Sequence, residues 1–277
     1  MIKTRIMVAI AATFLSCSAF ATDHGHHTAA HEENAPTPAA EAAGPACTGY
    51  GPQTPRDIDS KHGTNKVAFT AAPAAADLHL CNIHFHENAE HKSKEFSIFA
   101  GEGHEGNGSG YQCNISKTLS KAELAWQGDG VCKSEHGDLK PGDTIEVHYV
   151  HTSCDVPGGK GLGSCVSPSC ANPELRVETQ VFTLVAEGGL DFNQIQSAAA
   201  LPTNTGKPVE FIGSTTGPKY SDQKCSEYQV TWSVRPSCAK LNINSVGQWC
   251  KGNKYEEDHA HGVRKLVTDP SLLSEIK

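Results

Sequence analysis

Short apolar runs separated by turn-forming residues constrain the fold of this 277-residue chain most strongly. The runs are rich in β-branched and aromatic residues and alternate partly with polar ones. Segments rich in Gly, Pro, Asn and Asp divide them, which is typical of strands joined by turns. The runs cover residues 78–83, 96–99, 144–147, 177–185 and 228–234. A Pro-Gly-Asp turn at 141–143 directly precedes the third run. We therefore expect a mainly β domain.

Histidines concentrate in two of these expected strands. His84 and His86 form an H-x-H pair, and His148 and His151 lie on a later strand. Strand side chains alternate between faces, so the pair points one way, and a third histidine from a neighbouring strand would complete a zinc site. His148 and His151 face opposite sides, and spacing alone does not choose between them. Four further histidines compete for the same role: His79, His91, His104 and His136.

The first 21 residues predict a signal peptide. Lys3 and Arg5 precede an apolar run at 6–15, and small residues at 19–21 form a cleavage site. The run is too short to span a bilayer, and no later stretch approaches the required length, so we expect no transmembrane segment in the mature chain. We expect a periplasmic or secreted protein, without lipoprotein anchoring at Cys17.

Ten cysteines remain after the signal peptide, an even number in an exported chain. They are Cys47, Cys81, Cys113, Cys132, Cys154, Cys165, Cys170, Cys225, Cys238 and Cys250. Disulfides are the expected use, and the absence of C-x-x-C pairs argues against a zinc finger or a thioredoxin-like redox pair. The net charge of −8 argues against a basic surface that would bind nucleic acid. We expect a small-molecule substrate.

Residues 22–46 predict a disordered tether. They are rich in Ala, His, Glu and Pro and lack the large apolar side chains that a core requires. The histidines at 23–27, together with His31, suit either weak metal capture or a solvated tail, and composition does not decide between them. From Cys47 onward, residues 47–277 are long enough for one domain with a substantial core.

Several motifs in this domain, taken in order, resemble the alpha-type carbonic anhydrases. The matching stretches are residues 53–58 (the family's Q-S-P-x-D-I), 78–86 and 145–151 (its zinc-binding strands), 134–136, 213–218 (its G-S-x-T-T-P-P) and 230–232 (its V-T-W). The resemblance implies a twisted, mostly antiparallel sheet with short peripheral helices. It also implies a zinc enzyme, a lyase that hydrates carbon dioxide reversibly to bicarbonate and a proton.

The resemblance also implies roles for individual residues. His84, His86 and His148 match the three zinc ligands, and Glu135, 13 residues before His148, matches the family's gatekeeper glutamate. Zinc lowers the pKa of a bound water to about 7, so hydroxide is available to attack carbon dioxide. In the family's mechanism, Thr215 would orient that hydroxide and donate its own proton to Glu135.

Further residues are assigned around the ligands. Asn82 and Glu146 match residues that bond the first and third ligands, and alternation places Glu146 on the face of His148. Val150, Thr216 and Trp232 are expected in the substrate pocket.

The sequence also departs from the alpha pattern. Residues 87–133 contain an insertion, in which Cys113 and Cys132 are candidates for disulfide bonding. An apolar pocket residue is missing before Thr215, and Gly217 replaces a proline. These departures leave the pocket rim undefined, and the cysteine-rich delta-class carbonic anhydrases are the most similar class.

Two further expectations come from the same comparison. His62 lies in the region that supplies the family's proton shuttle, although its spacing differs, and a surface histidine is the alternative. Secreted relatives commonly bridge the regions that contain Cys47 and Cys225, so we expect that disulfide.

Three other functions were compared with this one. A copper/zinc superoxide dismutase would need a bridging histidine and a metal-binding aspartate, for which no pattern is present. A non-catalytic, carbonic anhydrase-related zinc-binding protein of the cell envelope is the main alternative, and loss of a ligand would favour it. Zinc storage through the N-terminal histidines is the third.

Overall fold

The computed structural model describes residues 47–277 except 68, 104–106, 135–136, 218 and 222. These residues belong to one unit of mutually contacting chain. The expected signal peptide at 1–21, the tether at 22–46 and Glu135 all lie outside the described residues.

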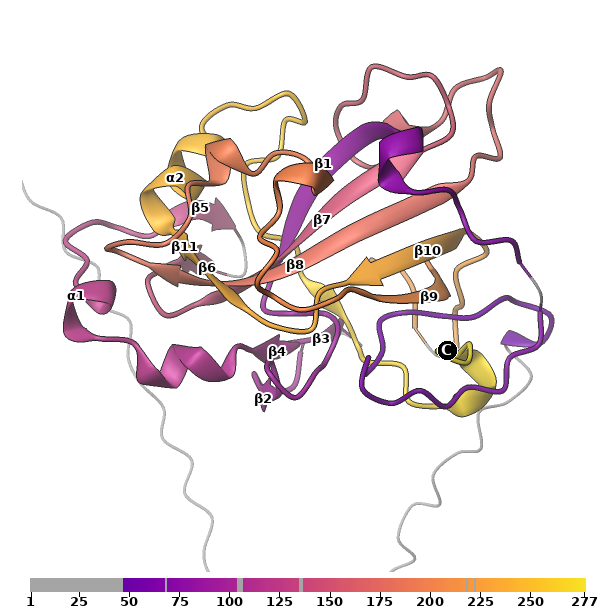
Figure 1. Ribbon diagram of the computed structural model, residues 1–277, viewed down its shortest axis with the longest axis horizontal. Coiled ribbons are helices and arrows are strands. Elements are labelled where there is room, and N and C mark those ends of the chain that lie inside the picture. Colours follow the sequence, from indigo (N-terminus) through magenta and orange to yellow (C-terminus); the bar gives the residue numbers. More distant parts are fainter. Residues whose placement is uncertain (1–46, 68, 104–106, 135–136, 218, 222) are drawn as a thin grey trace, which may run out of the picture. The chain divides into compact units, whose positions relative to one another are not determined.

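A six-stranded mixed sheet forms the centre of the domain (Figure 1). Its strands are β1 (His79–Glu87), β7 (Thr144–Thr152), β8 (Leu175–Val185), β10 (Gln229–Val234), β9 (Val209–Ser214) and β11 (Ala239–Asn242). The order is β1-β7-β8-β10-β9, and β11 pairs with β8. The β1–β7, β7–β8 and β10–β9 pairs are antiparallel, whereas β10 and β11 run parallel to β8. The expectation of a mainly β, mostly antiparallel fold is confirmed.

The local sequence explains where the central strands begin. Gly142 adopts a φ of 101°, which favours glycine, and the turn delivers the chain directly into β7. All nine residues of β7 are buried because strands flank it on both sides and both of its faces are covered. The expected strands at 78–83, 144–147, 177–185 and 228–234 lie largely in β1, β7, β8 and β10.

The two faces of the sheet differ in what covers them. On one face, Ile83, Phe85, Val147 and Tyr149 pack in an apolar cluster that includes Trp249. Trp249 lies on helix α2 (Ile243–Cys250), whose N-terminus is capped by the side chain of Asn242. On the other face, Val150, Val177 and Trp232 belong to a second cluster. The histidines of β1 and β7 share this second face.

Short elements surround the sheet. They comprise the two-residue strands β2 (Ile98–Phe99), β3 (Asn107–Gly108), β4 (Tyr111–Gln112) and β12 (Val263–Arg264), the hairpin β5 (Val131–Ser134) and β6 (Gly137–Leu139), and helix α1 (Lys121–Leu124). Single 3₁₀ turns occur at Ala75–Asp77, Asn114–Thr118, Leu162–Cys165, Phe192–Gln194, Ala198–Ala200 and Pro270–Leu272. None of the helices in the described part of the chain is both long and apolar enough to span a membrane.

Five disulfides connect the ten described cysteines. The bonds are Cys47–Cys225, Cys81–Cys165, Cys113–Cys238, Cys132–Cys250 and Cys154–Cys170. The expected Cys47–Cys225 bond is therefore present. Cys113 and Cys132 lie in the insertion, and each ties it to a segment more than 100 residues later rather than to the other. The insertion is thus fastened to the C-terminal part of the domain.

Candidate metal centre and pocket

The candidate metal centre lies where β1 pairs with β7. In this register His84 is opposite His148, and His86 is opposite Glu146. Because alternate residues share a face, all four side chains point to the same side of the sheet. The ring centroid of His148 lies 5.0 Å from that of His84 and 4.7 Å from that of His86. Strand register therefore brings the H-x-H pair together with His148.

His151 is placed differently, although it lies on the same strand. Its Nδ1 lies 2.9 Å from the carbonyl oxygen of Tyr149 and donates to it. His151 is buried and does not line the pocket that contains the other three histidines. Spacing left the choice between His148 and His151 open. In the structure His148 lies on the face of β7 that points to the pocket, and His151 does not line the pocket.

The His84 ring is oriented by Asn82. Its Nδ1 lies 2.6 Å from Asn82 Oδ1 and donates to it. The orientation of that amide is set in turn, because Asn82 Nδ2 donates to the carbonyl of Gly159 at 3.0 Å and to Glu257 Oε1 at 3.4 Å. With Nδ1 protonated, Nε2 is the nitrogen of His84 that is left to bind a metal.

His86 is oriented by the backbone rather than by a side chain. Its Nδ1 donates to the carbonyl oxygen of Gly262 at 2.8 Å. Its Nε2 is buried and has no hydrogen-bond partner among the described residues. A buried nitrogen without a hydrogen-bond partner is unfavourable, so the surroundings of this atom fit a metal-binding role.

Glu146 orients the ring of His148 through a hydrogen bond. Its Oε1 accepts from His148 Nε2 at 2.7 Å and from His91 Nδ1 at 2.8 Å, while Oε2 accepts from the His91 backbone N–H at 3.1 Å. Burial alone would raise the pKa of Glu146, but its contacts with His91 and His148 outweigh burial and keep that pKa well below the ordinary value. A buried carboxylate thus fixes the His148 tautomer that leaves Nδ1 free.

These three nitrogens fit a metal ion. The ligand atoms of His84, His86 and His148 lie within 4.8 Å of one another, and His84 Nε2 is 3.3 Å from His148 Nδ1. Burial lowers the pKa of His86 to about 4 and that of His84 well below its ordinary value, so both rings are neutral at pH 7. Three imidazoles, each with a hydrogen bond on its other nitrogen, match a zinc site with one open position.

A pocket of about 170 Å³ opens over the three histidines. One wall is apolar and is formed by Val150, Val177, Val230 and Trp232. The Trp232 Nε1–H donates to the carbonyl of Ser214 at 3.0 Å, so this ring presents carbon atoms to the pocket. The expected residues Val150 and Trp232 therefore line the same cavity as the ligands.

Thr215 and Thr216 also line the pocket, together with Gly217. Thr215 is buried, and its Oγ1 lies 2.6 Å from Ser226 Oγ. Glu135, the partner that the resemblance implies for Thr215, is outside the described residues. Ser226 is therefore the side-chain contact that the structure shows for this hydroxyl.

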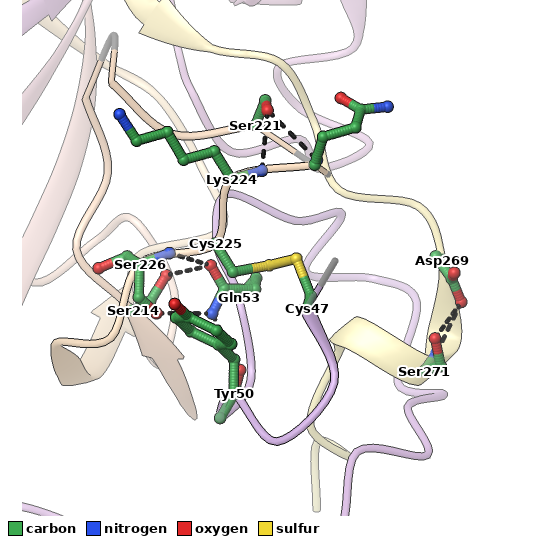
Figure 2. Close-up of a disulfide and its surroundings, with 12 residues drawn as sticks. Cys47, Tyr50, Gln53, Ser214, Ser221, Lys224, Cys225, Ser226, Asp269 and Ser271 are labelled. Atoms are coloured by element: carbon green, nitrogen blue, oxygen red, sulfur yellow. Dashed lines mark hydrogen bonds between the residues drawn. A yellow bond between two sulfur atoms is a disulfide. The ribbon is translucent and has the colours of Figure 1, made fainter. Parts of the chain in front are cut away.

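A disulfide and a buried glutamine hold this threonine loop (Figure 2). Cys225, the residue before Ser226, is bonded to Cys47. The side chain of Gln53 accepts from the Ser226 N–H at 2.9 Å and from Ser214 Oγ at 3.3 Å, and it donates to the Ser226 carbonyl at 2.9 Å. The N-terminal segment thereby fixes both ends of the stretch that contains Thr215.

The remaining wall contains residues to which the sequence analysis assigned no role. Glu257, His261 and Gly262 line the pocket, and the ring of His261 lies 5.6 Å from that of His84. They follow the last motif that resembles the alpha family, so no motif covered them. The A-H at 260–261 does repeat the H-x-H spacing with His259, and that repeat was the available signal.

His62 lies elsewhere. Its side chain is exposed, its carbonyl accepts from the Arg56 guanidinium at 3.3 Å, and it is not a lining residue of the pocket. His79 is exposed at the start of β1, and His104 and His136 are outside the described residues.

Comparison with known proteins agrees with this geometry. The profile of the delta carbonic anhydrase family matches residues 75–245, more than half of the chain. The match includes the three histidines and ends before the wall that contains Glu257. A search of curated proteins found no match. The chain belongs to the delta carbonic anhydrase family.

Proposed function

We propose that this protein is a zinc-dependent carbonic anhydrase that hydrates carbon dioxide reversibly to bicarbonate and a proton. The observation that carries the proposal is the arrangement of three imidazoles around one point. The nitrogens that face away from that point bond Asn82, Gly262 and Glu146, which leaves three free nitrogens for zinc. Zinc, when bound there, supplies the Lewis acidity that makes hydroxide available from water near neutral pH.

Thr215 is proposed to orient the attacking oxygen. Thr215 lines the same pocket as the histidines, and its hydroxyl can accept a hydrogen bond while donating its own proton to a second group. Ser226 Oγ is within reach for that donation, and the family resemblance assigns the same role to Glu135. A threonine held in this way would aim the oxygen lone pair at the substrate.

The apolar wall is proposed to bind carbon dioxide. Val150, Val177 and Val230 present hydrocarbon to the cavity, which suits a small molecule without net charge. Thr216 would form part of the rim. The five disulfides fit an oxidising compartment, and we infer that the protein is exported to the periplasm or the medium.

Stopped-flow hydration of carbon dioxide, with zinc analysis of the same sample, tests this function. We expect one zinc per chain and measurable hydration, and we expect His148→Ala to lose both because it removes a ligand from a three-ligand site. His151→Ala is the matched control, since it removes a histidine from the same strand without touching the pocket. Full zinc occupancy without hydration of carbon dioxide would overturn the proposed enzymatic function. It would favour a non-catalytic zinc-binding protein.

A further inference from the structure

The segment from Glu257 to His261 lies against the strand that carries two of the ligands. The His261 N–H donates to the Phe85 carbonyl at 2.9 Å, and the Glu87 N–H donates to the His261 carbonyl at 2.9 Å. These bonds form one parallel bridge between His261 and His86 of β1. They place His261 where its side chain lines the pocket. Its position is therefore set by the backbone as well as by packing.

Glu257 fixes the ring of His261. Glu257 Oε2 lies 2.8 Å from His261 Nε2, and its other oxygen accepts from Asn82. The Glu257 side chain is only 6% exposed. Burial alone would raise the pKa of this carboxyl, but the hydrogen bonds from His261 and Asn82 outweigh burial and hold it below the ordinary value. Glu257 is therefore a carboxylate at neutral pH. One of its oxygens bonds Asn82, which orients His84, and the other bonds His261 in the pocket wall.

A row of imidazoles leads outward from the ligands. The His261 ring lies 5.6 Å from the His84 ring, and the His259 ring lies 5.0 Å from the His261 ring. His84 is half-buried, whereas the side chains of His261 and His259 are 38% and 43% exposed. The row thus connects a buried metal centre with an imidazole that solvent can reach.

The groups that face His259 favour proton exchange at one nitrogen. Asp258 Oδ1 lies 2.6 Å from His259 Nδ1, and this hydrogen bond lowers the pKa of Asp258 below its ordinary value. The charge of Lys160 also lowers the pKa of Asp258, and the ring of His261 lies against that of His259. Nδ1 is engaged by the carboxylate, so Nε2 is the nitrogen that can take up and release a proton.

We propose that His259 carries the proton between the pocket and the solvent, with the Glu257–His261 pair positioning the path. The inference rests on the proposed hydration activity. Each carbon dioxide hydrated releases one proton from water, His259 Nε2 takes up that proton, and a buffer base then removes it. No electrons are transferred, and one proton enters and leaves the imidazole per turnover. His259 takes the role that sequence comparison suggested for His62.

Two kinetic quantities separate this role from binding and chemistry. In a reaction whose proton release follows substrate conversion, kcat reports the release step and kcat/KM reports the conversion of carbon dioxide. We expect His259→Ala to lower kcat in dilute buffer on the order of tenfold to a hundredfold, with kcat/KM and zinc content unchanged. Imidazole added to the buffer should restore kcat. His79→Ala, which removes another exposed histidine, is the control.

Glu257→Gln tests the positioning role. It should lower kcat in dilute buffer by less than His259→Ala, and imidazole should restore kcat here too, which a general loss of structure would not allow. As a readout independent of turnover, the NMR signals of the His261 ring nitrogens should change in Glu257→Gln, because Nε2 loses its carboxylate partner.

Several results would overturn the inference. These are a wild-type kcat in His259→Ala at every buffer concentration, a parallel fall in kcat and kcat/KM in that variant, unchanged His261 NMR signals in Glu257→Gln, or the buffer-dependent loss appearing in His62→Ala instead. Absence of hydration in the wild-type protein would instead be a failure of the proposed function.

Discussion

The three histidines proposed as metal ligands and the loops around them are held in place by different means. His84, His86 and His148 project from neighbouring central strands, so backbone register sets their spacing. Thr215 and His261 lie outside the β1–β7 pair, and a disulfide-anchored segment and a buried carboxylate hold them respectively. We therefore expect the sheet to set the spacing of the three histidines, and these two segments to affect turnover. Disturbing the loops should therefore affect turnover or stability without displacing the metal.

Removal of the Cys47–Cys225 bond should have the largest energetic effect of the tests on this comparison. The bond closes a loop with a sequence separation of 178, so the Cys47→Ser/Cys225→Ser variant should lose about 2–5 kcal/mol of unfolding free energy. Denaturant titration measures this loss. Zinc content should remain at wild-type level, because the three histidines lie on central strands and not on the two segments that this bond joins. Zinc loss in a protein that is still folded would contradict the distinction between strands and loops.

Thr215→Val should come next. It keeps the shape of the side chain but removes the hydroxyl that we propose orients the attacking oxygen, so kcat/KM should fall on the order of 100-fold with zinc retained. Glu135→Gln and Ser226→Ala, each combined with Thr215→Val, identify the partner of this hydroxyl. The true partner should add little to the loss caused by Thr215→Val. If Thr215→Val has wild-type activity, the loop plays no orienting role.

Glu146→Gln tests the strand side of the site. The substitution keeps the shape of the native side chain but removes its charge, so the bond to His148 weakens and zinc affinity should fall about 10–100-fold. Competition with a chelator measures the affinity. Glu178→Gln is the matched control, because Glu178 is also buried on a central strand but pairs with Arg176 and Arg235 away from the pocket. Equal zinc affinities in the two variants would show that Glu146 does not support the ligand.

The smallest expected effect is the pH dependence caused by Glu257. Its pKa in the folded protein lies below 4.5, so its contribution to stability is complete above pH 4.5 and is lost as the pH falls through the lower folded value. In metal-free protein, the Tm of wild type should exceed that of Glu257→Gln at neutral pH, and this difference should shrink below pH 4.5. The exposed Glu187 provides the control in Glu187→Gln. A pH-independent difference would mean that the charge of Glu257 does not matter.

Part of this site was predictable because it depends on local alternation. The H-x-H spacing placed His84 and His86 on one face, and alternation placed Glu146 with His148, as the structure has them. Resemblance to a known family supplied the choice of His148 and the Cys47–Cys225 pair. The other four disulfides were not predictable, because they join cysteines whose proximity depends on the packing of segments distant in sequence.

By itself, the sequence determined which side chains of the two histidine-bearing strands share a face. A side-chain period of two is a local property of the backbone, so the residue pattern is enough to place ligands and their supports on one face. Only the tertiary structure decided the rest of the centre. The Gly262 carbonyl that orients His86 lies 176 residues away in the chain, and Glu257 is brought to Asn82 across 175. No local period relates positions so far apart, and it is the packing of the C-terminal segment along β1 that brings them together.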